Sequence, residues 1–187
     1  MTINTITATT VFTDEVLVRA AELAKDAYRP VWTGASGEES TGESVARHLE
    51  AATDLLEGDG WARTYTSASS VSTELPAIEA MRIEDMLREV LLAVRDEITA
   101  TATAPRTLSV ALEHVAHGED GDGDTRYVAF EVLNLLVRAL TGHDQALATS
   151  WAERLHRTQQ DITDLLAAAA RFARTYGPRD AEATQAA

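Results

Sequence analysis

Four carboxylates in the second half of the chain have the spacing of a helix-flanked calcium loop. Such a loop places carboxylate ligands at its first, third, fifth and twelfth positions, because their oxygens must surround one cation. Thr125 stands at the sixth position, where a glycine normally makes the sharp turn. A second interpretation is that glycines make a flexible turn here, and that Asp124 or Thr125 caps the helix that follows. We call residues 120–131 the acidic loop; its four carboxylates are Asp120, Asp122, Asp124 and Glu131.

Two histidines form a second candidate metal site. His114 and His117 are three residues apart on a short predicted helix, and Glu113 stands beside them. Two imidazoles at this spacing share a helix face and can bind zinc together with a carboxylate. The alternative is that both lie at the C-terminal end of the helix, where the helix dipole and solvent favour histidine without any ligand.

Three polar side chains interrupt a helix predicted over residues 125–140 that is apolar on nearly every other face. Glu131, Asn134 and Arg138 recur at spacings of three and four residues, which places them on one narrow stripe. They could line a polar pocket for a small molecule or substrate. They could equally form a satisfied set of hydrogen bonds, since buried polar groups are usually paired for structural reasons.

Other kinds of catalytic machinery have little support in the sequence. No serine lies within a Gly-x-Ser-x-Gly elbow, and cysteine is absent, which removes thiol nucleophiles, thiolate metal sites and disulfides. The only lysine, Lys25, lies inside a predicted helix rather than after a glycine-rich phosphate loop. The sequence therefore favours a protein that is not an enzyme, and it predicts no cofactor.

Charge and hydropathy limit the partners of the chain. The formal net charge is -14, which repels phosphate backbones, so we expect no nucleic-acid partner. An acidic surface suits a basic protein partner, although it more often serves solubility alone. No stretch approaches the roughly 18 consecutive apolar residues of a membrane span, and residues 1–13 lack the pattern of a signal peptide. We therefore expect a cytoplasmic protein without a membrane partner.

Helices must position all of these residues, and helical patterns cover most of the chain. They predict an all-α bundle of about six helices in a single domain over residues 13–177, between tails at 1–12 and 178–187. The helix at 125–140 should be the most buried one, because its polar face is so thin. Residues 31–42 are rich in Gly, Ser and Glu, which predicts a mobile surface loop. The expected helices run over about 13–28, 41–57, 76–99, 107–117, 125–140 and 143–176.

The last of these helices carries an apolar seam with a heptad-like rhythm. The segment contains no Gly or Pro, and at about 1.5 Å per residue it would be roughly 50 Å long. The seam could be a homodimer interface, or it could pack in the bundle core, because neighbouring alanines widen the apolar face. We expect core packing for most of its length, with one end projecting to form a homodimer. The candidate interface residues are Leu155, Ile162, Leu165, Phe172 and Tyr176.

Two segments resemble a known family. Residues 51–61 read Ala-Ala-Thr-Asp-Leu-Leu-Glu-Gly-Asp-Gly-Trp, and residues 131–136 read Glu-Val-Leu-Asn-Leu-Leu after the turn at Asp124 and Thr125. Both are similar to segments of a family of small uncharacterised helical domains of unknown function, encoded in high-GC genomes. The resemblance implies an all-helical fold and a capping role for Thr125, and it implies no activity.

These observations favour one class of function and leave two others open. The leading hypothesis is a non-catalytic interaction or regulatory protein that acts through a helical surface on another protein or on a second copy of itself. The first alternative is a calcium-responsive protein that uses the acidic loop. The second is a small-molecule binder or enzyme with a polar pocket at Glu131, Asn134 and Arg138.

Overall fold

Helices make up the regular structure of the described chain. The computed structural model describes residues 11–64, 82–102, 104–118 and 121–179. Within these ranges it contains seven helices and no strand, which confirms the predicted all-α class. The helices are α1 (Asp14–Lys25), α2 (Gly42–Asp59), α3 (Ile83–Ala102), α4 (Leu108–Ala116), α5 (Gly123–Thr141), α6 (Ala148–Ala152) and α7 (Gln159–Tyr176).

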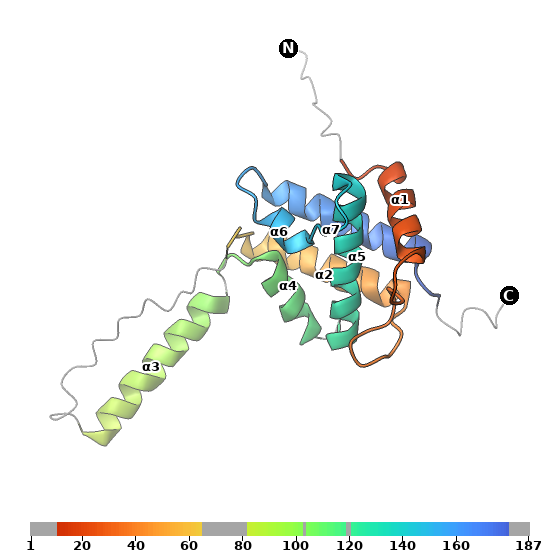
Figure 1. The fold of residues 1–187 in the computed structure, drawn as a ribbon. Helices are drawn as coiled ribbons and strands as arrows, with labels where there is room; N and C mark the ends of the chain where they lie inside the picture. Colours follow the sequence, from red (N-terminus) through yellow and green to blue (C-terminus); the bar gives the residue numbers. More distant parts are fainter. Residues whose placement is uncertain (1–10, 65–81, 103, 119–120, 180–187) are drawn as a thin grey trace, which may run out of the picture.

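Two crossing pairs of helices build the bundle around a shared core. In Figure 1, α2 and α7 run across the view side by side, whereas α1 and α5 run up and down it. The amphipathic patterns of these helices explain the arrangement, because each helix turns its apolar side chains toward the others. α4 packs against α2 and α5, and the short α6 packs against α5, which closes the core.

α5 is the central helix, as its thin polar face predicted. Ten of its 19 residues are buried, and Leu133 and Leu136 are fully inaccessible. Gly142 ends the helix with a φ of 71°, a left-handed conformation that a residue with a Cβ rarely adopts. The Gly142 N–H donates to the Arg138 carbonyl at 2.8 Å. α5 therefore has a fixed end and can position side chains on the few faces that it leaves open.

α3 is the exception to this packing. Figure 1 shows it apart from the bundle, and no other helix packs along it among the described residues. Its predicted start at Pro76 lies outside the described residues. The chain leaves the bundle at Trp61 and returns at Arg106, which form an isolated bridge. The Ala62 N–H donates to the Arg106 carbonyl, and the Arg106 N–H donates to the Gly60 carbonyl, both at 2.9 Å, so the two ends are held side by side.

The C-terminal segment differs from the single long helix predicted over residues 143–176. α6 and α7 are separate helices, and a turn over residues 153–158 joins them. Arg63 donates side-chain hydrogen bonds to three carbonyls of this turn, which gives these groups partners outside a helix. Thr158 then starts α7 through a capping box with Asp161. The continuous helix was therefore a wrong prediction, because a long-range contact and a strong cap divide it.

Two other boundaries also differ from their predictions. Phe12, inside the predicted N-terminal tail, is only 1% exposed and packs edge-on against Trp151, with ring centroids 5.9 Å apart. Phe12 therefore belongs to the core. The helix predicted over about 41–57 begins one residue later, at Gly42, because the Thr41 hydroxyl caps it by accepting the Ser44 N–H at 3.2 Å.

Candidate functional site

Most of the acidic loop is helical, because residues 123–131 belong to α5 and Asp122 caps that helix. Asp122 Oδ1 accepts the backbone N–H groups of Asp124 and Thr125, both at 2.8 Å, and Oδ2 accepts the Thr125 hydroxyl at 3.0 Å. These bonds satisfy N–H groups that have no partner within the first turn of a helix. A cap exists here, as one interpretation of the sequence predicted, but Asp122 supplies it.

Asp124 ties α5 to the loop between α1 and α2, which we call the α1–α2 loop. Asp124 Oδ1 accepts the Ser36 N–H at 2.8 Å, and Oδ2 accepts the Ser36 hydroxyl at 2.5 Å. The bond from the Ser36 hydroxyl, followed by that from its N–H, lowers the pKa of the Asp124 carboxyl below its ordinary value. Gly34 lies so close that a Cβ there would collide with Asp124. Asp124 is therefore the anchor of this loop.

Glu131, the other described carboxylate of the acidic loop, does not join Asp122 and Asp124 in one cluster. Glu131 follows Asp122 by about two and a half helical turns, a rise of about 13 Å along the axis of α5. Asp120 lies outside the described residues. In the described part of the chain, no group of three or more His, Asp or Glu side chains is arranged to hold a metal ion. The calcium site stays a prediction, and it would require Asp122 and Asp124 to leave their present partners.

The two candidate histidines lie at the C-terminal end of α4. They line a pocket of about 370 Å³ together with Glu113. His117 Nδ1 lies 2.8 Å from the Glu113 carbonyl oxygen, which is a contact of the helix end. The Glu113 carboxylate also pairs with Arg126, so it is engaged by a neighbour on α5. These local contacts fit the interpretation of His114 and His117 as residues of a helix C-terminus.

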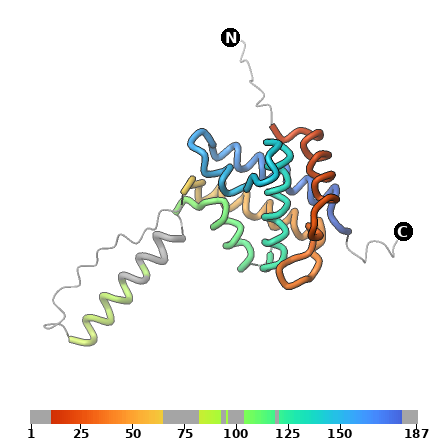
Figure 2. The backbone as a smooth tube through the Cα atoms, viewed as in Figure 1, coloured from red at the N-terminus to blue at the C-terminus, as the bar shows by residue number. Residues whose placement is uncertain are grey.

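Contacts along its length hold the α1–α2 loop, although composition predicted that residues 31–42 would be mobile. The Gly34 N–H donates to the Glu38 carbonyl at 2.7 Å, which closes a tight turn. Trp32 stacks on Phe172 of α7, with ring centroids 6.2 Å apart and an angle of 15° between the planes. Figure 2 shows the loop beside the start of α5, where its serine is bound. Gly34 permits this close packing of the loop against Asp124.

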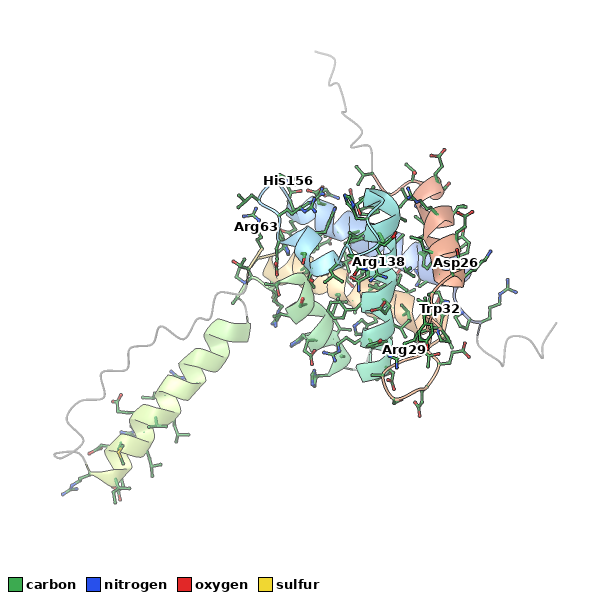
Figure 3. The ribbon with its side chains drawn as sticks, in the orientation of Figure 1. Asp26, Arg29, Trp32, Arg63, Arg138 and His156 are labelled. Carbon is green, nitrogen blue, oxygen red and sulfur yellow. The ribbon has the colours of Figure 1, made fainter. Side chains whose placement is uncertain are left out.

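A pocket of about 580 Å³ lies between the α1–α2 loop and one face of α5. The loop contributes residues 27–31 and 33–37. Figure 3 labels Arg29 on the loop and Arg138 on α5, the two guanidinium groups of this pocket. We call the cavity the α5 pocket. Its residues from α5 recur every three or four positions, as one helix face requires: Tyr127, Glu131, Leu135 and Arg138.

The predicted polar stripe of α5 divides between two roles. Glu131 and Arg138 line the α5 pocket, and Arg138 Nε also donates to the Ala146 carbonyl at 3.3 Å. Asn134 is buried, and its Oδ1 accepts the Ala148 N–H at 2.9 Å. Asn134 is therefore a satisfied hydrogen-bond partner that fixes the start of α6, which was the alternative interpretation of the stripe.

Sequence reasoning missed the other polar residues of the pocket. Tyr127 stands one helical turn before Glu131, so extending the stripe along the helix would have found it. Arg29 belongs to a loop, and no periodicity relates a loop residue to a distant helix. A tertiary contact places it beside α5, and only the structure shows that contact.

The predicted interface residues of the last helix also divide. Ile162, Leu165 and Phe172 are fully buried in the core of the single chain. Leu155 lies in the turn before α7 and is 86% exposed, and Tyr176 at the end of α7 is 40% exposed. Core packing therefore accounts for the middle of the seam. The homodimer interface stays a prediction for Leu155 and Tyr176.

A second exposed surface lies on α3. Four apolar side chains follow the helical repeat and form one stripe, which we call the α3 stripe. Glu84 and Arg88 lie along one edge of the stripe, and Glu89 lies farther round the helix. Large contiguous patches of exposed apolar side chains are uncommon on monomeric proteins and often mark interaction sites. The α3 stripe consists of Ile83, Leu87, Val90 and Leu91, which are 72%, 56%, 44% and 67% exposed.

These features define an all-α bundle with a projecting amphipathic helix and a charged pocket on its central helix. The chain belongs to the DUF6197 family, a family of unknown function, whose sequence model matches residues 40–172. The match includes α2 to α6 and most of α7, whereas α1 and most of the α1–α2 loop precede it. Comparisons with curated proteins and with solved structures gave no match. Within the described ranges, none of the helices has both the length and the apolar character that a bilayer span requires.

Proposed function

We propose that the protein is a cytoplasmic, non-catalytic interaction protein that binds another protein through the α3 stripe. The observation that carries this proposal is the exposure of Ile83, Leu87 and Leu91 on a helix along which no other described helix packs. An amphipathic helix of this kind suits a binding mode in which its apolar face lies in a groove of the partner. Burying these side chains would supply the driving force for association.

Charge supports a basic partner. Glu84 borders the stripe, α3 as a whole has five acidic and two basic residues, and the chain carries a formal net charge of -14. A groove with an apolar floor and a rim of Lys or Arg would bury the stripe and pair these carboxylates at the same time. A second copy of the chain would bring two acidic helices together, and like charges in an interface oppose association. We therefore propose a different protein as the occupant.

A comparison of variants in the native host tests this proposal. The full chain and its variant with Leu87→Glu and Leu91→Glu would be tagged and recovered under the same conditions. We expect a stoichiometric protein partner with the wild type, its loss with the double variant, and weaker binding as salt screens the charges. Arg88→Glu is the matched control, because it adds negative charge to the same helix outside the stripe, and it should retain the partner.

Retention of the partner by the double variant would contradict the role of the α3 stripe. Light scattering identifies the other occupant: a wild-type dimer that becomes monomeric in the double variant would assign the stripe to a second copy of the chain. A dimer that persists in the double variant would instead support the interface predicted at Leu155 and Tyr176.

A further inference from the structure

We propose that the α5 pocket binds a small organic zwitterion, a molecule with a carboxylate, an ammonium group and an apolar body. This site is independent of the α3 stripe, because it lies on the bundle, whereas α3 projects from it (Figure 1). Three properties of the pocket support the proposal: a wall that is already formed, charged groups of both signs, and an apolar floor.

The wall of the pocket is already in place. Ser36 is bound to both carboxylate oxygens of Asp124, and Gly34 approaches Asp124 too closely to carry a side chain. On its other side, the loop is held by the stacking of Trp32 on Phe172. A ligand that enters a formed pocket avoids the entropic cost of ordering a loop.

Three charged side chains line the pocket without an ion pair to any described residue. They are Arg29, Glu131 and Arg138, and Arg138 is held in place by the bond from its Nε to the Ala146 carbonyl. The chain has 30 acidic and only 16 basic residues, so carboxylate partners for arginine are plentiful within it. Pocket guanidinium groups that have no such partner among the described residues are available to the carboxylate of a ligand.

The arrangement along α5 fits both charges of one small molecule. Glu131 and Arg138 are about 10 Å apart along the helix axis, and Arg29 lines the pocket from the loop, so a guanidinium group and the Glu131 carboxylate can approach the same ligand from different sides. The planar guanidinium suits a carboxylate, and the Glu131 carboxylate accepts hydrogen bonds from an ammonium group.

Beside these charges the pocket has an apolar floor and enough room for a ligand. Leu135 lies between Glu131 and Arg138 on α5 and is 3% exposed, and Val31 contributes from the loop at 8% exposure. The pocket volume of about 580 Å³ is within the range of about 300–1,000 Å³ that is usual for small-molecule sites. Free amino acids with apolar side chains have the required chemistry.

Titration calorimetry on the full chain tests this inference. The ligands are L-phenylalanine and L-leucine, compared with hydrocinnamate, which lacks the ammonium group, and phenethylamine, which lacks the carboxylate. We expect both amino acids to bind and each single-charge analogue of phenylalanine to bind at least about tenfold more weakly. Glu131→Gln and Arg29→Gln should each weaken phenylalanine binding by about tenfold. The matched controls Glu153→Gln and Arg179→Gln, at exposed positions outside the pocket, should leave it unchanged.

Several results would overturn the inference. The absence of binding by both amino acids at millimolar concentration would remove the ligand class. Equal binding of hydrocinnamate and phenylalanine would show that Glu131 does not recognise the ammonium group. Unchanged affinity in both pocket variants would show that the ligand does not bind in the α5 pocket. Thermal melts separate binding from folding: neither Arg29 nor Glu131 has an ion-pair partner among the described residues, so both variants should melt like the wild type.

Discussion

Three leucine-to-alanine substitutions would show whether the bundle and α3 are energetically separate. Leu133 at the centre of α5 is 0% exposed, Leu91 on α3 is 67% exposed, and Leu155 in the turn before α7 is 86% exposed. Each substitution removes the same three side-chain carbons. The variants therefore differ mainly in the surroundings from which these carbons are removed.

The expected losses of stability follow from burial. At Leu133, three carbons at about 0.8 kcal/mol each give about 2.4 kcal/mol, and the cavity left behind raises the cost to about 3–5 kcal/mol. At Leu91 only about a third of this burial is lost, so the cost is at most about 0.8 kcal/mol, and the higher helix propensity of alanine offsets part of it. A loss of about 3 kcal/mol lowers the melting temperature of a domain of this size by about 6–12 °C.

Urea unfolding followed by tryptophan fluorescence is the assay. Trp151 is only 2% exposed, so its emission reports the opening of the core. We expect the midpoint to fall strongly for Leu133→Ala and to stay near the wild-type value for Leu91→Ala and Leu155→Ala. If Leu91→Ala costs as much as Leu133→Ala, α3 is packed into the core and its stripe is not available to a partner.

Three further predictions concern single features. Arg174 donates hydrogen bonds that lower the pKa values of Glu43 and Glu50. These pairs therefore stabilise the folded state by about 0.2–1 kcal/mol each above pH 4.5, and this stabilisation is lost as pH falls through the lowered pKa values. The free energies of unfolding of the wild type and Arg174→Gln, measured by urea titration, should therefore become equal at acidic pH. A difference that stays constant with pH would contradict this prediction. Asn134→Ala should cost about 1–3 kcal/mol, because it leaves the first N–H of α6 without an acceptor, and a wild-type melting temperature would refute it. The melting temperature should be the same in calcium and in chelator, because Asp122 and Asp124 have other partners and Glu131 lies apart from them. A higher melting temperature in calcium would establish a metal site in the acidic loop.

Local signals predicted the elements whose ends are set by neighbouring residues. Thr107 was expected to start a short helix, and its hydroxyl accepts the Val110 N–H at 3.3 Å at the start of α4. The central helix was expected to end near residue 140, and Gly142 ends it in the left-handed conformation. The all-α class and the burial of α5 followed from hydrophobic periodicity, because that pattern records which helix faces avoid water.

Distant contacts explain what the sequence could not predict. The apolar rhythm continues through residues 153–158, yet the helix is divided there, because Arg63 binds the carbonyls of the turn from more than 90 positions away. Arg157 lies 3.7 Å from the centroid of the Trp151 ring, a second contact that fixes the turn. The α5 pocket has the same origin, since Arg29 reaches α5 only through the fold of its loop.

The bridge between Trp61 and Arg106 makes the core insensitive to the length of chain between its two ends. Because these ends are already adjacent, a doubling of the intervening segment would cost only about 0.6 kcal/mol in closure entropy. The segment that carries α3 could therefore be shortened, extended or exchanged for a different helix, while the bundle keeps its own packing. For the proposed function, this means that the binding helix could change while the bundle that carries it stays the same.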